Sequence, residues 1–132
     1  MLFSLVIQTE TKTQPLKMRA ILPTLKQKKR YVAFEVVSRE AIQSYEDIKR
    51  AIVEAGLSFL GELGMAEAGI RIIDDDYDPK TQRGIIKVGH KHVERLDSAL
   101  MMVRKIGRND AIIRCVGISG ILAKAEKRYI LA

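Results

Sequence analysis

Four aspartates between residues 74 and 78 form the densest group of potential metal ligands in the sequence. Three of them have the i, i+2, i+4 spacing of a calcium-binding loop. Such a loop needs glycine at its sixth position and glutamate at its twelfth, whereas this sequence has Pro79 and Ile85 there. We therefore predict a hairpin turn whose aspartates bind their own backbone, with a metal site as the weaker alternative. The four residues are Asp74, Asp75, Asp76 and Asp78.

His90 and His92 are the second candidate, because a His-x-His pair on a strand can bind zinc. No third or fourth ligand is close to them in the sequence. The pair lies where a strand is expected to meet a helix, among Lys87, Lys91 and Arg95. Phosphate contact at the helix N-terminus is therefore the more natural function, and a solvated helix cap is the competing interpretation.

The remaining reactive residues do not predict catalysis by this chain. Cys115 is the single cysteine and lies among aliphatic residues, which predicts a buried, unreactive thiol. A lone cysteine also excludes an intramolecular disulfide, so a reducing, cytoplasmic setting is expected. The sequence has no Ser-His-Asp spacing, phosphate-binding loop or nucleotide fingerprint, so we predict neither catalytic residues nor a cofactor bound by this chain.

Charge is segregated along the chain, which has a net charge of +7. Residues 1–34 and 83–132 carry +6 and +7, whereas residues 35–82 carry −6. Segregation of this kind favours one surface that faces a polyanion, and nucleic acid is the leading class. A solvated charge run is the competing interpretation for the basic arm, which consists of Lys26, Lys28, Lys29 and Arg30. No apolar run approaches the roughly 20 residues that cross a bilayer.

Hydrophobic periodicity predicts the elements that would position these residues. Strands are expected at 30–38, 70–74, 85–88 and 111–116, and helices at 44–64, 93–107 and 119–129. The order β-α-β-β-α-β with an extra C-terminal helix predicts an α+β sandwich. It is typical of the ferredoxin-like or RNA-recognition-motif-like arrangement, with a four-stranded antiparallel sheet in the order 4-1-3-2. Residues 26–132 would form this single domain. Residues 1–25 would be an irregular extension, with Met18 as an alternative start.

The two faces of the predicted sheet differ in character. Phe34 and the alternating valines of the first strand would face the helices, and Glu35 would lie on the open face between Arg114 and Lys87. The open face carries enough apolar residues that the C-terminal helix or a partner should cover part of it. Tyr31 would face outward, but the third strand has no aromatic residue, so recognition of single strands by base stacking is not expected.

Three stretches resemble the family of protein component 2 of archaeal ribonuclease P. They are "LPTLKQKKRYVAFEV" at residues 22–36, "GIIKVGHKHVERLDSALMMVRKI" at residues 84–106 and "RCVGISGILAKAEKRYI" at residues 114–130. Ile121 stands where the family pattern has threonine. The resemblance covers about residues 18–130 of this chain, and the three stretches occur in the family's order.

The resemblance implies a non-catalytic subunit of a ribonucleoprotein. An RNA subunit, using a divalent metal such as Mg²⁺, would remove the 5′ leader of precursor tRNA. Protein component 3 would be the protein partner, precursor tRNA would be reached indirectly, and no membrane partner is implied. Self-association within the assembly stays open. A partner protein would bind the acidic first helix or the open sheet face.

RNA contact is expected at seven positions, chosen from charge and location. They are Lys26, Lys28, Lys29, Arg30, Lys87, His90 and Lys91. Arg30, Lys87 and His90 also fall on positions of the family pattern. The alternative from another class is a stand-alone ferredoxin-like metal-dependent enzyme or ligand sensor, which would use the aspartates at 74–78 and the two histidines.

Overall fold

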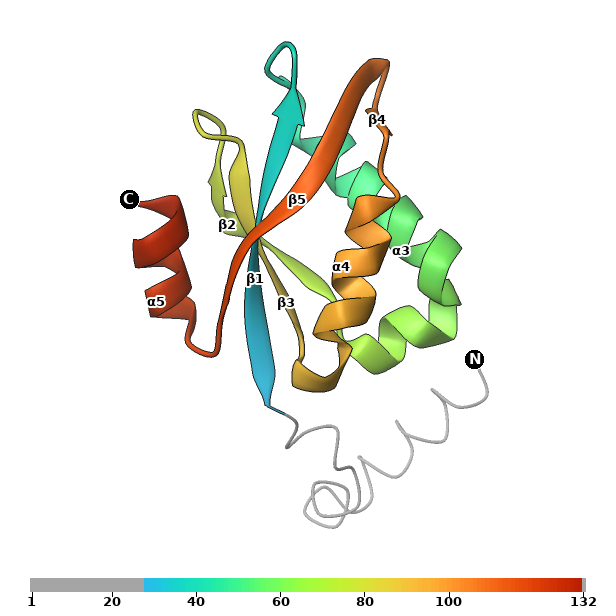
Figure 1. Cartoon of the computed structure of the whole chain (residues 1–132), viewed down its shortest axis with the longest axis vertical. Helices are drawn as coiled ribbons and strands as arrows, with labels where there is room; N and C mark the ends of the chain where they lie inside the picture. Colours follow the sequence, from blue (N-terminus) through green and yellow to red (C-terminus); the bar gives the residue numbers. More distant parts are fainter. Residues whose placement is uncertain (1–27, 132) are drawn as a thin grey trace, which may run out of the picture.

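The computed structural model describes residues 28–131 as an antiparallel sheet with helices on both faces (Figure 1). The strands are β1 (Lys29–Ser38), β2 (Arg71–Asp78), β3 (Arg83–Gly89), β4 (Lys105–Ile106) and β5 (Asn109–Ser119). The helical elements are α3 (Tyr45–Ala68), η2 (His90–His92), α4 (Val93–Met101), α5 (Leu122–Ala125) and η3 (Glu126–Ile130). The predicted N-terminal extension, the alternative start at Met18 and the candidate Lys26 lie outside the described residues.

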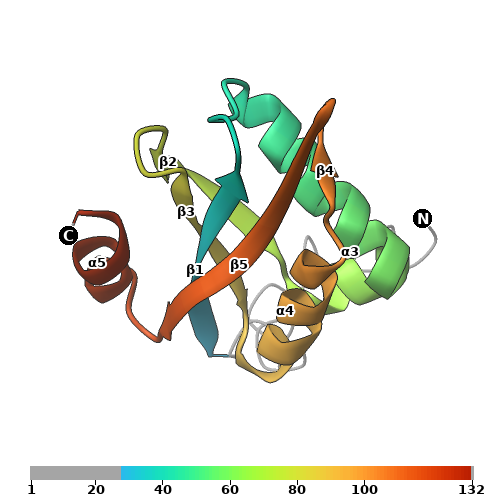
Figure 2. The ribbon, with the colours of Figure 1, turned by 45° about the horizontal axis from the view of Figure 1, so that its top comes forward.

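Five strands, rather than the four predicted, lie in the order β2-β3-β1-β5-β4. The additional strand β4 pairs with the start of β5 across a tight turn in which Gly107 has φ +62°. Helix α4 ends at Met101 and not at Gly107 as predicted. The chain leaves the helix there, and Ile106 of β4 packs into the core with 1% of its surface exposed. α3 and α4 pack on one face of the sheet, and the C-terminal segment lies on the other (Figure 2).

Helix α3 begins as predicted but ends later. Ser44 is its N-cap and accepts a hydrogen bond from the Asp47 backbone N–H at 3.3 Å. Gly61, predicted to help end the helix, instead makes a kink with φ +75° and ψ 171°. The chain regains helical geometry because Ala68 beyond it is buried in the core. The helix then ends at Gly69, whose left-handed backbone donates to the carbonyls of Met65 and Ala66.

None of the helices in residues 28–131 is long and apolar enough to cross a membrane.

The core lies between the sheet and the two longer helices. The predicted alternation of the first strand is confirmed, because Val32, Phe34 and Val36 are all buried there. Phe34 sits opposite Gly84 of β3, where a Cβ would stand only 2.6 Å from the phenyl ring. Glycine is therefore the residue that makes room for Phe34, and this pair fixes the register of β1 against β3.

The β2–β3 hairpin confirms part of the prediction for the aspartate-rich stretch. Asp78 accepts hydrogen bonds from the Lys80 backbone N–H at 2.9 Å and from the Thr81 hydroxyl at 3.3 Å. The strand is longer than predicted, however, because β2 continues to Asp78 through a register shift after Ile73. Gln82 closes the hairpin with φ +55°, and its buried amide exchanges hydrogen bonds with the backbone of Ile42.

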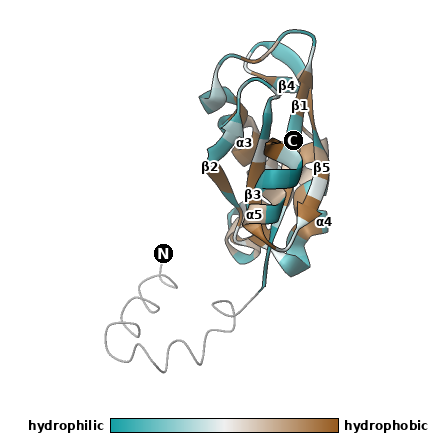
Figure 3. Ribbon diagram, turned by 90° about the vertical axis from the view of Figure 1, so that its left-hand side faces the viewer, coloured by the Kyte–Doolittle hydropathy of each residue, from teal (hydrophilic) through white to brown (hydrophobic). Residues whose placement is uncertain are grey.

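The C-terminal segment covers the middle of the open face, as predicted for the C-terminal helix. Figure 3 looks onto this side, where α5 lies in front of the sheet. Ala33 and Ile85 beneath it are fully buried. The Tyr129 ring packs directly on Gly117, where an added Cβ would stand 2.1 Å from the ring. The predicted helix is a short α-helical turn followed by a π-helical turn.

Candidate nucleic-acid interface

The start of β1 and the end of β3 bring the predicted RNA-contacting residues together. In the antiparallel register Lys29 pairs with Gly89, and Tyr31 pairs with Lys87. Directly beyond the strands, the His90 backbone N–H donates to the Lys28 carbonyl at 2.9 Å. Two groups that are about 60 residues apart in sequence therefore form one surface. We call it the strand-end cluster: Lys28, Lys29, Arg30, Lys87, His90 and Lys91.

Members of the strand-end cluster differ in how free they are to contact a ligand. Lys28 and Lys91 are exposed, whereas the others are half-buried. The Lys29 ammonium lies over Gly69 at the C-terminus of α3, where it complements the negative end of the helix dipole. The Arg30 guanidinium donates to the Lys29 carbonyl at 3.1 Å and lies beside Gly120. Lys28 and Lys91 are therefore the best placed for phosphate contact.

The two histidines stand in η2, at the entrance to α4. The His90 ring donates through Nδ1 to the Lys28 carbonyl oxygen at 3.2 Å, which fixes the imidazole against β1. His92 Nδ1 is buried and has no hydrogen-bond partner in the described part of the chain. Residues 28–131 contain no group of three or more His, Cys, Asp or Glu side chains arranged to hold a metal ion. A zinc site at this pair finds no support there.

The aspartates of β2 serve separate local structures. Asp74 accepts from the Tyr45 hydroxyl at 2.7 Å and pairs with Lys49 at 3.2 Å, and these hydrogen bonds lower the pKa of its carboxyl. Asp76 instead lies against Glu126 of η3; burial and this second carboxyl raise the pKa of Asp76 to about 6. Because their partners differ, these carboxylates do not converge on one ion. The metal-enzyme alternative therefore gains no support.

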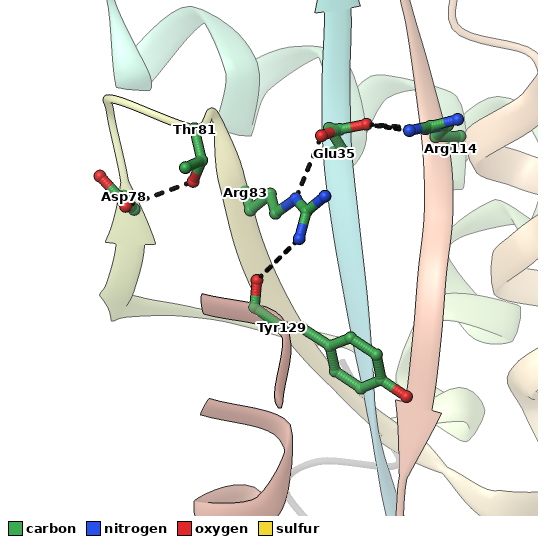
Figure 4. A network of polar contacts seen from close by, with 6 residues as sticks. All are labelled: Glu35, Asp78, Thr81, Arg83, Arg114 and Tyr129. Carbon is green, nitrogen blue, oxygen red and sulfur yellow. Dashed lines mark hydrogen bonds and ion pairs between the residues drawn. The ribbon is translucent and has the colours of Figure 1, made fainter. Parts of the chain in front are cut away.

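Glu35 links three strands across the open face (Figure 4). It accepts from Arg114 Nε at 2.7 Å, as predicted, and from Arg83 Nε at 3.1 Å. The predicted neighbour Lys87 was wrong, because the register places Arg83 opposite Glu35 and Lys87 opposite Tyr31. Burial alone would raise the pKa of Glu35, but the two arginines outweigh it and lower the pKa below the ordinary value.

Arg83 also ties the C-terminal segment to the sheet. Its Nη1 donates to the Tyr129 carbonyl at 3.2 Å, so one guanidinium joins Glu35 and η3 (Figure 4). Arg83 and Arg114 consequently share the single negative charge of Glu35. They are poorer candidates for phosphate contact than their charge in the sequence suggests.

Arg71 is a basic residue of this surface that the sequence did not reveal. It lies in the acidic middle of the chain, but the β2–β3 register places it opposite Lys87. A regular hairpin register extended from the β2–β3 turn does not pair Arg71 with Lys87, because the register shifts between Ile73 and Asp78. The only signal in the sequence is a cation at the first residue of the second strand.

Cys115 is half-buried beside the core rather than fully buried. Burial raises the pKa of its thiol, and its sulfur lies 3.7 Å from the Gly117 carbonyl oxygen. The scarcity of thiolate agrees with the prediction of an unreactive cysteine.

Comparisons with known proteins agree with the family resemblance. A model of the Rpp14/Pop5 family matches residues 30–130. Ribonuclease P protein component 2 of Thermococcus gammatolerans is 39% identical over 114 residues, which cover 86% of this chain and 92% of that protein. The protein of the same name from Pyrococcus abyssi is 38% identical over 115 residues, with coverages of 87% and 95%.

A solved structure shares the fold. A chain in the cryo-EM structure of yeast ribonuclease MRP matches with a TM-score of 0.51 at 14% identity. The match covers 71% of this chain and 75% of that chain. The family model spans nearly all of the described residues, and the archaeal relatives match along most of their length. The chain belongs to the Rpp14/Pop5 family.

Proposed function

We propose that this chain is a protein subunit of ribonuclease P, the ribonucleoprotein that removes the 5′ leader of precursor tRNA. The observation that carries the proposal is the near-full-length similarity to archaeal proteins named ribonuclease P protein component 2. The chain would not itself break a bond. It would hold the catalytic RNA in its active arrangement, while a divalent metal such as Mg²⁺ acts within the RNA.

The strand-end cluster is the proposed RNA-contacting surface. Strand pairing and the His90–Lys28 backbone hydrogen bond hold together the backbone from which these cations extend. Lysine and arginine contacts to phosphates position an RNA without reading its sequence. They also release condensed counterions, so affinity should fall steeply as salt rises. Lys26 is proposed to extend this surface.

A protein partner is proposed for the solvent-exposed face of α3. α3 exposes apolar side chains between acidic ones, which suits a partly apolar, partly basic surface of another subunit. We propose protein component 3 as that subunit, with self-association as the competing occupant. The exposed apolar residues of α3 are Val53, Leu57, Phe59 and Leu63. We also propose that the fold is a five-stranded variant of the ferredoxin-like arrangement. The protein is proposed to act in the cytoplasm.

Reconstitution tests the proposed function. Precursor-tRNA cleavage should be measured with the RNA subunit and the remaining protein subunits, with and without this chain. Addition of the chain should raise the cleavage rate or lower the Mg²⁺ concentration needed. No effect on either quantity would contradict the proposal. Hydrolysis by the chain alone with added Mg²⁺ or Mn²⁺ would favour the stand-alone metal-dependent enzyme.

A further inference from the structure

A pocket of about 340 Å³ opens on the sheet face beside the strand-end cluster. It lies among the starts of β1 and β2, the end of β3, and α5. Its volume is near the lower end of the roughly 300 to 1,000 Å³ found for small-ligand sites, so one nucleotide-sized group is a suitable occupant. The residues that the argument uses are Tyr31, Arg71, Asp75, Lys87 and Leu122.

The pocket offers an aromatic and an aliphatic surface. Tyr31 comes from β1 and Leu122 from α5, and both side chains are half-buried. A tyrosine face stacks on any nucleobase, and apolar contact from a second element limits access of water to the base. One half-buried tyrosine ring can stack a single base, although base stacking along a strand would need further aromatic residues.

Two cations line the same pocket in one row across the sheet. Lys87 is directly opposite Tyr31 on one side and directly opposite Arg71 on the other. Within residues 28–131, neither cation makes an ion pair, whereas Arg83, Arg114 and Lys49 all do. Two unneutralised cations side by side repel one another, and an anion between them would relieve that repulsion.

Asp75 adds a carboxylate to the lining of the pocket. Its carboxylate is exposed and lines the cavity, while the neighbouring Asp74 is occupied by Tyr45 and Lys49. A carboxylate only accepts hydrogen bonds, so it selects a ribose hydroxyl or an exocyclic amino group. It also repels phosphate, which directs the anionic end of a ligand toward Lys87 and Arg71.

We infer that this pocket binds one unpaired nucleotide of an RNA strand, with its base on Tyr31 and its phosphate on Lys87 and Arg71. The inference rests on the proposed function and adds to it a site for a splayed-out base. Phosphate contacts by the strand-end cluster would hold the neighbouring backbone. The chain would therefore distinguish an unpaired strand from a duplex, whose bases are stacked and inaccessible.

The test uses the full 132-residue chain and two fluorescein-labelled probes. One is a single-stranded RNA octamer of mixed sequence, and the other is a blunt RNA duplex of the same sequence. Binding is followed by fluorescence anisotropy for wild type, Tyr31→Phe and Tyr31→Leu. Tyr31→Phe should bind both probes like wild type. Tyr31→Leu should weaken octamer binding by roughly 5- to 150-fold, the range for losing one base–aromatic stack, and leave duplex binding unchanged.

Several outcomes would overturn the inference. Equal losses on both probes would make Tyr31 a structural residue, and no loss on the octamer would show that no base stacks there. Displacement of the octamer by AMP at equal phosphate concentration would assign the pocket to free mononucleotides. If wild type binds neither probe, the proposed RNA contact fails together with the inference.

A second measurement needs no variant and is independent of folding defects. The octamer is synthesised with 4-thiouridine and irradiated in complex with the wild-type chain. Crosslinks should map by mass spectrometry to the peptides that carry Tyr31 and Lys87. Crosslinks confined to other peptides would contradict the assignment.

Discussion

Glu35 connects two neighbouring strands because it accepts a hydrogen bond from Arg83 and another from Arg114. Glu35→Gln should lower the free energy of unfolding by about 1 to 3 kcal/mol, because charge-assisted hydrogen bonds are lost. Urea unfolding at neutral pH measures this. Glu40→Gln is the matched control, since Glu40 is exposed in the following loop and should have little effect. A Glu35→Gln protein as stable as wild type would contradict this role.

The same pair of proteins gives a pH dependence with a defined sign. The arginines lower the pKa of Glu35 in the folded state, so the unfolded chain takes up the proton first as pH falls. Its stabilising contribution is complete above the ordinary value of about 4.5 and is lost as pH falls through the folded pKa. The stability gap between wild type and Glu35→Gln should therefore shrink in acid.

Single residues were predictable where strand alternation decides their face. Alternation was enough to place Glu35 beside Arg114 and Phe34 in the core. It could not identify Arg83 as the second partner of Glu35, because β1 and β3 are separated by a helix and their register is fixed in three dimensions by Phe34 filling the space over Gly84.

Among the elements, the C-terminal segment depends on a glycine in the strand beneath it. Gly117→Ala should push the Tyr129 ring off β5 and loosen α5 and η3, because a Cβ would overlap the ring. Hydrogen exchange at residues 122–130 should then speed up. Gly120→Ala is the matched control, since its Cβ would meet only the flexible Arg30 guanidinium at 3.4 Å. Equal exchange in the two variants would contradict this packing.

The contact between Asp76 and Glu126 makes the same segment sensitive to pH. The pKa of Asp76 is raised to about 6, so the stability gained from its proton is complete below about 3.8 and is lost as pH rises through about 6. Asp76→Asn should therefore stabilise the protein at pH 8 by about 1 kcal/mol and change little at acidic pH. Urea unfolding at both pH values measures this. A variant less stable than wild type at pH 8 would contradict the account.

Elements with strong hydrophobic periodicity were predicted, and irregular ones were not. The Ser44 cap and the first part of the apolar face of α3, with Ile48 and Ile52, could be identified from the sequence. Phe59 and Leu63, which continue the same spacing, are exposed. The true end of α3 could not be identified, because a glycine such as Gly61 usually marks a helix C-terminus, whereas here the helix continues beyond it. Strand β4 has only two residues, too few to show any period. The register shift in β2 likewise has no sequence signal, and it decides that Arg71 joins Lys87.

At the scale of the whole molecule, the two ends of the sheet consist of different structures. The starts of β1 and β2 and the end of β3 meet at the strand-end cluster and the pocket beside it. The opposite end carries the β2–β3 and β4–β5 turns. Charge segregation in the sequence predicted a polyanion-facing surface, and the antiparallel pairing shows which cations lie together at one end of the sheet. Removal of the same number of positive charges should therefore weaken RNA binding more at this end of the sheet than at the other.

The most direct test compares two triple variants in RNA binding over a salt series. One variant carries Lys28→Ala, Lys87→Ala and Lys91→Ala in the strand-end cluster. The other carries Arg39→Ala, Lys80→Ala and Arg108→Ala, which are exposed cations at the opposite end of the sheet. Both lose three positive charges, so any general electrostatic effect is matched.

The measured quantity is the dissociation constant for the ribonuclease P RNA between low and physiological salt. The cluster variant should bind more weakly, and its log–log salt slope should fall by about 2 to 3, since each lost phosphate contact removes nearly one unit. The opposite-end variant should keep most of the wild-type slope. Equal slopes in the two variants, or a larger loss in the opposite-end variant, would contradict the strand-end cluster as the RNA-contacting surface.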